Sequence, residues 1–314
     1  MARDIPLTNR LALPLALAAL SVLPWIGLSA EPARIDPDAT VIDDRGREVQ
    51  VTAHPERIIS LAPHLTELLF AVGAGERIVA TVEHADHPAE ARSLPRIGSA
   101  VQLDLERIVA LEPQLVIAWA SGSPRAPMER LEALGLNVYY SEPTDFAGIA
   151  RDLRRLGQIS GTSDSAEAAA AAFEREIGDL RARHSGRAPI TVFYQVWDPP
   201  LMTVNDRHLI GEALRLCGGT NVFGDLEALV PRPGREAVLA ANPEVIVTGG
   251  PGEDRADWLE PWRAWTGLTA VQRDNLFFIP PSLIQRPTPR IARGTGMLCD
   301  ALEQARLRRP ESDP

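Results

Sequence analysis

Residues 106–117 read ERIVALEPQLVI, and residues 236–247, which lie 130 positions further along the chain, read EAVLAANPEVIV. Each stretch has the pattern of a short amphipathic helix, a proline that ends the helix, and a continuous apolar strand. Continuous apolar strands that alternate with helices are typical of a parallel sheet covered by helices on both faces. The two stretches therefore predict the same α/β unit twice.

The segments before these stretches repeat in the same order. A strand pattern at 57–61 and a helix that ends near Gly73 precede the first stretch, and a strand pattern at 189–193 and a helix that ends near Gly218 precede the second. Glycine can adopt the left-handed conformation that ends a helix. We therefore expect an α/β fold of two similar lobes, each a mainly parallel sheet flanked by helices, with a ligand cleft between them at the carboxyl ends of the strands.

A long helical segment joins the two halves. Residues 144–160 have a helical pattern that Gly161 closes, and the sequence from Asp164 to Glu167 is that of a capping box, which predicts a second helix over 165–184. This helix would span about 30 Å and hold the lobes nearly fixed. We expect the following organisation: a signal peptide (1–30), an N-terminal lobe (31–160), a connecting backbone helix (161–187), a C-terminal lobe (188–309) and a tail (310–314).

The first thirty residues have the pattern of an export signal. Arg3 and Arg10 form a basic start, residues 11–28 are almost wholly apolar, and a small-residue cleavage site follows at Ala30. An uncleaved membrane anchor is the alternative, because the apolar run is near the minimum length of a span. Two prolines interrupt the run, so we expect cleavage and a soluble, exported protein.

Export gives the two cysteines a structural meaning. Cys217 ends a predicted helix and Cys299 lies within the last one. An even number of cysteines in an oxidising compartment suggests one disulfide. Two buried free thiols are the alternative.

Composition and missing motifs exclude several functions. The 314 residues carry 42 acidic and 32 basic side chains, for a net charge of −10. Such a surface repels phosphate backbones, so we expect no nucleic-acid partner. The motifs of serine hydrolases, zinc proteases, P-loop enzymes and dinucleotide-binding folds do not occur in the sequence. We therefore predict a binding protein with no catalytic residues and no cofactor, and keep an enzyme as a more distant alternative.

Candidate ligand contacts lie where predicted strands end. Trp119 follows the apolar strand at 115–118, and Trp197 follows the strand at 191–196 in the matching place of the second half. Packing in the core is the alternative for each. Two indoles at strand ends suit a large planar or amphipathic ligand. We interpret His84, in the sequence HADH, as a side chain at the cleft mouth rather than a metal ligand. Three further tryptophans have near-helical spacing and are assigned to the core, with one member at its rim: Trp258, Trp262 and Trp265.

Several motifs resemble those of a known family. They are RIISLAP at 57–63, DLERIVALEP at 104–113, LVIAW at 115–119, LCGG at 216–219, and the segment from Arg286 to Arg290. In these motifs the chain is similar to the helical-backbone class of periplasmic receptors for iron–siderophore, haem and cobalamin importers, over residues 40–307. Within the class it most resembles the cobalamin receptors.

The resemblance implies a periplasmic, monomeric receptor that captures a cobalamin-type corrinoid and delivers it to the membrane permease of an ABC importer. It implies a ligand contact by Trp119 and by Arg286. His84 stands where cobalamin receptors have a tyrosine, and because a tryptophan near Val101 is missing, we expect Trp197 to supply some of the lost stacking surface. A haem or ferric-siderophore receptor of the same fold is the alternative. The residues that could serve as an axial ligand of haem are His64, His84 and Tyr140.

The resemblance also bears on the cysteines and on docking. It implies that Cys217 and Cys299 form a disulfide, as in the cobalamin receptors. Glu106 and Glu236 hold equivalent positions in the two repeats, where the helix dipole alone would favour an acidic residue. Receptors of this class use one glutamate per lobe to meet arginines of their transporter, so we expect these two carboxylates to form the docking pair.

Overall fold

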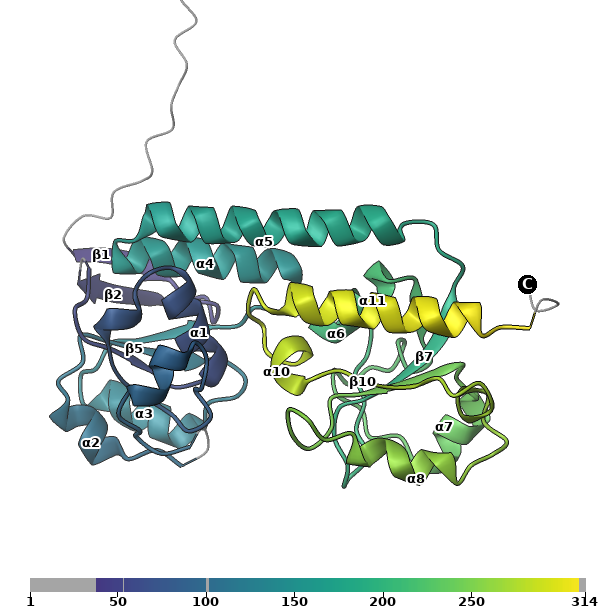
Figure 1. Ribbon diagram of the computed structural model, residues 1–314. Helices are drawn as coiled ribbons and strands as arrows, with labels where there is room; N and C mark the ends of the chain where they lie inside the picture. Colours follow the sequence, from purple (N-terminus) through teal and green to yellow (C-terminus); the bar gives the residue numbers. More distant parts are fainter. Residues whose placement is uncertain (1–37, 53, 100–101, 311–314) are drawn as a thin grey trace, which may run out of the picture. The chain divides into compact units, whose positions relative to one another are not determined.

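Two four-stranded parallel sheets organise the chain (Figure 1). The computed structural model describes residues 38–52, 54–99 and 102–310, so the predicted signal peptide and nearly all of the predicted tail lie outside the described residues. The first sheet has the order β4-β3-β5-β6 and the second the order β8-β7-β9-β10. Their strands are β3 (Ile58–Ser60), β4 (Ile78–Thr81), β5 (Leu115–Trp119), β6 (Val138–Ser141), β7 (Ile190–Gln195), β8 (Gly219–Asn221), β9 (Val245–Thr248) and β10 (Leu276–Phe278).

The predicted internal repeat is confirmed by the order of the elements. The first half runs β3, α1 (Pro63–Ala71), β4, α2 (Leu105–Ala110), β5, and the second runs β7, α6 (Leu209–Leu216), β8, α7 (Arg235–Ala241), β9. The glycines that follow α1 and α6 adopt the expected left-handed conformation, with φ of 80° at Gly73 and 71° at Gly218. Equal orders of strands place equivalent residues of the two halves at equivalent edges of their sheets.

The remaining elements surround these two sheets. A short antiparallel hairpin of β1 (Asp38–Ile42) and β2 (Glu48–Thr52) precedes the first sheet and was not predicted. Its second strand buries only Val49 and Val51, which is too short an alternation to stand out in the sequence. The other elements are α3 (Arg125–Ala133), α4 (Phe146–Ser160), α5 (Ser163–His184), α8 (Glu260–Arg263), α9 (Thr269–Gln272), α10 (Pro281–Ile284) and α11 (Ile291–Leu307), with short 3-10 turns at η1 (Gly75–Arg77), η2 (Ala89–Ser93) and η3 (Asp257–Leu259).

Helix α5 is the connecting helix that the sequence predicts. It lies along α4 and contacts α1 of the first half and α6 and α11 of the second (Figure 1). The predicted capping box is wrong, because the helix begins at Ser163 with no side-chain cap. Gly161 ends α4 in the left-handed conformation, and the Thr162 hydroxyl lies 2.8 Å from the Ser160 hydroxyl, so the chain turns directly from α4 into α5.

Helices cover both faces of each sheet. One cluster of buried side chains extends from the first sheet through α5 to the second, and includes Ile117, Phe173 and Val247. Smaller clusters lie on the opposite faces, around Val116 in the first sheet and around Ile246 in the second. This is the two-faced burial that continuous apolar strands indicate.

A disulfide joins two helices of the second half. Cys217, at the end of α6, is bonded to Cys299 in α11, and both residues are fully buried. The predicted pairing is therefore present. Among the described helices, none combines the length and apolar character that crossing a membrane requires.

Candidate ligand-binding site

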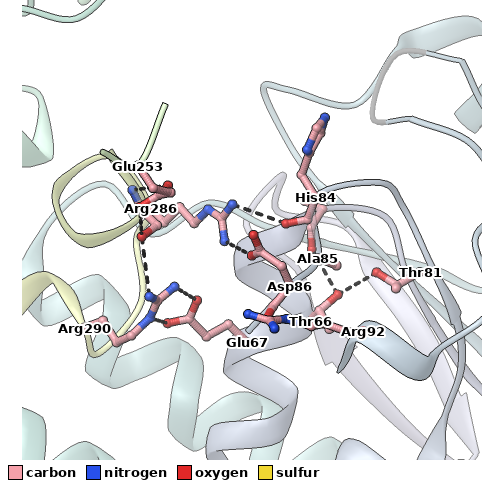
Figure 2. Close-up of polar contacts among 12 residues, drawn as sticks. Thr66, Glu67, Thr81, His84, Ala85, Asp86, Arg92, Glu253, Arg286 and Arg290 are labelled. Atoms are coloured by element: carbon pink, nitrogen blue, oxygen red, sulfur yellow. Dashed lines mark hydrogen bonds and ion pairs between the residues drawn. The ribbon is translucent and has the colours of Figure 1, made fainter. Parts of the chain in front are cut away.

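An ion pair brings the carboxyl edges of the two sheets together. Arg286, which follows α10, donates from Nη1 to Asp86 Oδ1 at 2.9 Å and from Nη2 to the carbonyl oxygen of His84 at 3.2 Å (Figure 2). Burial alone would raise the pKa of Asp86, but the hydrogen bond and charge of Arg286 outweigh it and lower that pKa. Two of the predicted ligand contacts, His84 and Arg286, thus lie side by side although 202 residues separate them.

Arg286 binds the backbone carbonyl of His84 and leaves its imidazole free. His84 has a φ of 63°, in the left-handed region, and its side chain is exposed. The ring points away from Arg286 and Asp86 (Figure 2). His84 therefore combines a fixed backbone with an available ring nitrogen.

A second ion pair between the halves lies close to the first. Arg290 binds Glu67 through two hydrogen bonds, Nε to Oε1 and Nη2 to Oε2, both of 2.6 Å. The Glu67 side chain is only 5% exposed. Burial alone would lower the pKa of Arg290, but the hydrogen bond and charge of Glu67 raise it. Parallel hydrogen bonds of this kind fix geometry as well as charge.

Trp119 is held in a cradle at the end of β5. Its indole Nε1 donates to Glu142 Oε1 at 3.0 Å, and its backbone N–H donates to the Ser123 hydroxyl at 3.0 Å. A Cβ atom at Gly122 would lie within 1.9 Å of the ring, so only glycine fits there. His64 meets the indole edge-on, with ring centroids 5.2 Å apart. The tryptophan is half-buried in this setting.

His64 is an uncharged member of this cradle. Burial, with a contribution from the charge of Arg286, lowers its pKa to about 3. Its Nε2 is buried and has no hydrogen-bond partner within the described residues. His64 therefore contacts Trp119 directly, and it lies close enough to Arg286 for that positive charge to lower its pKa.

Trp197 lies apart from this cluster. It follows β7, its side chain is 52% exposed, and its ring meets that of Trp258 with centroids 5.3 Å apart. The core assignment of the three spaced tryptophans holds for Trp262, which is fully buried. It is wrong for Trp265, which is 42% exposed, and Trp258 is the member at the rim.

The two predicted docking residues occupy equivalent places. Glu106 lies in the first turn of α2 and Glu236 in the first turn of α7, and both are exposed. In each half this helix precedes an inner strand of the sheet, β5 or β9, so its start lies at the carboxyl edge. Next to Glu236, Arg235 forms an ion pair with Asp198 at 2.6 Å.

Sequence reasoning missed several residues of this region. Asp86 is part of the HADH sequence and Arg290 is part of a recognised motif, but the pairing of Asp86 with Arg286 and of Glu67 with Arg290 carries no sequence signal. Glu142 directly follows β6, and this position at a strand end was the one sequence signal for its place in the site.

A cavity of about 810 Å³ beside the Arg290–Glu67 pair was also not predicted. Its lining includes Phe70, His87, Leu94 and Pro289, but neither Trp119 nor Trp197. Within the described residues, no group of three His, Cys, Asp or Glu side chains could hold a metal ion.

Known proteins share this sequence and fold. Residues 58–283 match the periplasmic binding protein family. The chain is 36% identical over 251 residues to the vitamin B12-binding protein of Vibrio cholerae serotype O1, a match that covers 80% of this chain and 90% of that protein. The crystal structure of the periplasmic vitamin B12 binding protein BtuF of Vibrio cholerae superposes with a TM-score of 0.73 at 34% identity, over 81% of this chain and 98% of that one.

A more distant structure shares the fold. The periplasmic heme-binding protein RhuT from Roseiflexus has a TM-score of 0.69 at 24% identity, over 79% of this chain and 98% of that one. The family match spans most of the chain and includes both four-stranded sheets and the Trp119 and Trp197 strand ends, while α11 lies beyond it. This chain therefore belongs to the periplasmic binding protein family.

Proposed function

We propose that this protein is a periplasmic receptor that captures a cobalamin-type corrinoid and delivers it to the membrane permease of an ABC importer. The observation that carries the proposal is the 36% identity to a vitamin B12-binding protein over four-fifths of the chain. The receptor acts as a monomer, binds without a cofactor and catalyses no reaction. In this proposal the lobes are residues 31–160 and 188–309, and the connecting segment 161–187 contains α5.

The ligand is held between the carboxyl edges of the two sheets. A corrin is a large disc with apolar faces and an edge of amides. In this proposal the indole of Trp119 covers part of a face, while the Arg286 guanidinium and the His84 imidazole meet polar groups of the edge. Trp197 contributes from the second lobe, where half of its surface is free. Aromatic side chains with fixed orientation suit such a ligand because little entropy is lost on binding.

Two of the three candidate axial ligands weigh against haem. Tyr140 is buried, its hydroxyl donates to Glu132 at 3.1 Å, and burial together with the charge of Glu132 raises its pKa to about 12. His64 is buried against Trp119. Of the three candidates only His84 is exposed. A ferric siderophore is anionic and would require a cluster of free arginines, whereas Arg286 and Arg290 are already paired with carboxylates.

Absorption and fluorescence spectra of the purified protein test the proposal. Cyanocobalamin should quench indole fluorescence and co-elute with the protein, and haemin should not. Replacing Trp119 by alanine should weaken cobalamin binding by roughly 1–3 kcal/mol, the contribution of a buried aromatic contact. If the wild-type protein binds haemin and not cobalamin, the alternative ligand is correct. If Trp119→Ala and Arg286→Ala both bind cobalamin normally, the pocket is assigned to the wrong residues.

Docking to the permease is assigned to Glu106 and Glu236. Their equivalent, exposed positions suit a transporter with two-fold symmetry. Charged groups at the rim of an interface steer association and choose the partner. The test reverses both charges, Glu106→Arg and Glu236→Arg, and measures ligand affinity and transporter-coupled uptake separately. Uptake should fall while ligand affinity stays the same; uptake that survives both reversals, or affinity that falls with it, refutes this docking pair.

A further inference from the structure

Trp197 and Trp258 form an aromatic corner on the second lobe, and we propose that this corner binds the aromatic base at the end of the nucleotide loop of a complete corrinoid. The inference rests on the proposed function and names a part of the ligand that the function alone does not assign. The two rings meet at 70° with centroids 5.3 Å apart. The corner therefore offers one indole face beside the edge of another.

Hydrogen bonds fix the orientation of the Trp197 indole. Its Nε1 donates to the carbonyl oxygen of Pro199 at 3.0 Å, and its backbone carbonyl accepts from the N–H of Met202 at 2.9 Å. The neighbouring Asp198 is tied to Arg235 by an ion pair of 2.6 Å. Trp197 is 52% exposed, yet its indole nitrogen and its backbone are both hydrogen-bonded, so it presents a preformed stacking surface.

The corner lies at the carboxyl edge of the second sheet. Trp197 follows β7, and Trp258 lies in η3, between β9 and β10. Gln195 at the end of β7 is in register with Thr248 at the end of β9, so both indoles come from the same edge. This is the edge from which Arg286 reaches across to Asp86 in the first lobe.

The division of aromatic groups matches a ligand with two flat parts. Trp119 lies against His64 in the first lobe, whereas the Trp197–Trp258 corner is a separate aromatic group on the other lobe. A complete corrinoid likewise has a broad corrin disc and a small aromatic base. The corrin periphery is saturated and carries methyl and amide groups, while the base is a flat aromatic system. Aromatic rings prefer offset stacked and edge-to-face contacts, and a corner of two indoles offers both to one small ring.

The test compares cyanocobalamin with cobinamide, the corrinoid that lacks the nucleotide loop and its base. Dissociation constants of both are measured for the wild-type protein and for Trp197→Ala, Trp197→Phe and Trp258→Ala. Trp265→Ala is the matched control, because Trp265 is also exposed but lines a different hollow with Leu239 and Asn242. Stacking of a base on an aromatic side chain corresponds to a loss of roughly tenfold in affinity or more when that side chain is removed.

We expect Trp197→Ala to weaken cobalamin binding roughly tenfold while cobinamide binding changes by less than about twofold. Trp258→Ala should act in the same direction, and Trp197→Phe should restore most of the preference for cobalamin. The control Trp265→Ala should bind both ligands like the wild type.

Three results would overturn the inference alone. Equal losses for cobalamin and cobinamide would assign Trp197 to the corrin disc, and unchanged binding of both would remove the corner from the ligand site. Normal binding with reduced uptake would assign it to the permease. A wild-type protein that binds neither corrinoid would instead overturn the proposed function, and this inference with it.

Discussion

Among single residues, Glu142 bears most directly on the orientation of Trp119. Its carboxylate accepts hydrogen bonds from Trp119 Nε1, from the backbone N–H of Ser121 and from the Ser121 hydroxyl, at 3.0, 2.6 and 2.9 Å. Its own N–H donates to Asp44 Oδ2 at 2.7 Å, which ties the loop to the β1–β2 hairpin. Glu142 is therefore a positioning residue for the indole.

Replacing Glu142 by alanine should lower the free energy of unfolding by about 1–3 kcal/mol, because three donors lose a charged acceptor. The emission of Trp119 should also change, which indole fluorescence in the absence of ligand would detect. Glu142→Gln keeps an acceptor and should recover most of both effects. A matched control is Glu129→Ala, which breaks the exposed Arg125–Glu129 pair on α3 and should change little. Equal effects of Glu142→Ala and Glu129→Ala would contradict the assigned role.

His64 makes stability depend on pH in a predictable direction. Its pKa is about 3 in the folded protein, against the ordinary value of 6.5 that it regains when the chain unfolds. Between these values the unfolded chain binds the proton and the folded protein does not, so the stabilisation is present above pH 6.5 and is lost as the pH falls towards 3. The slope is about 1 kcal/mol per pH unit between pH 6 and pH 4.

His64→Phe should flatten this slope, since phenylalanine keeps a ring against Trp119 and cannot be protonated. Urea unfolding at pH 7.5, 6 and 5 measures it. The comparison with wild type removes other contributions that both proteins share. Burial lowers the pKa of His208 to about 4 and also lowers the pKa of His184, whereas it raises the pKa of Asp152 to about 6, which contributes with the opposite sign. Parallel curves for wild type and His64→Phe would show that the pKa of His64 is the same in the folded protein as in the unfolded chain.

The candidate site was predictable where strand ends gave the signal. Trp119 and Trp197 follow apolar strands, and the structure has both at the carboxyl edge of a parallel sheet. The contacts of Trp119 with Glu142 and of Trp197 with Trp258 were not predicted, because side-chain orientation after a strand depends on the loop conformation. The pairing of Arg286 with Asp86 joins residues 200 positions apart, and no local pattern encodes such a contact.

At the scale of elements, the disulfide between α6 and α11 should be a large single contribution to stability. It closes a loop of 82 residues, for which the chain-entropy estimate is about 4.5 kcal/mol. The double variant Cys217→Ala, Cys299→Ala should unfold at a lower urea concentration and be insensitive to reductant. Wild type should lose comparable stability when it is reduced. A wild-type protein whose unfolding midpoint is the same with and without reductant would contradict this prediction.

The elements themselves were predictable because the repeat made each half support the interpretation of the other. Proline after α2 and α7, and left-handed glycine after α1 and α6, mark helix ends that depend on local conformation. The start of α5 was not predicted correctly. The chain turns tightly through Gly161 and Thr162, so the helix begins at Ser163 and not at the predicted cap, Asp164. This start depends on the packing of α4 against α5, which has no local sequence signal.

At the scale of the whole molecule, the two halves are joined by more than α5. The buried core passes from one sheet to the other. The Glu212 carboxylate of α6 accepts from the backbone N–H of Phe146 in α4 at 2.9 Å. The ion pairs Arg286–Asp86 and Arg290–Glu67 add contacts on the side of the sheet edges. The relation of the lobes therefore depends on charged contacts as well as on the connecting helix.

The Arg290–Glu67 pair should be the strongest of these charged contacts. Glu67 is nearly buried and bound through two hydrogen bonds, so removing one partner leaves the other charge poorly solvated. A double-mutant cycle with Glu67→Gln and Arg290→Met should give a coupling free energy of about 1–3 kcal/mol. The same cycle on the exposed Arg125–Glu129 pair should give a coupling close to zero. If the two cycles give the same result, the Glu67 carboxylate is sufficiently hydrated in solution to need no partner, and the Arg290–Glu67 pair does not help to hold the lobes together.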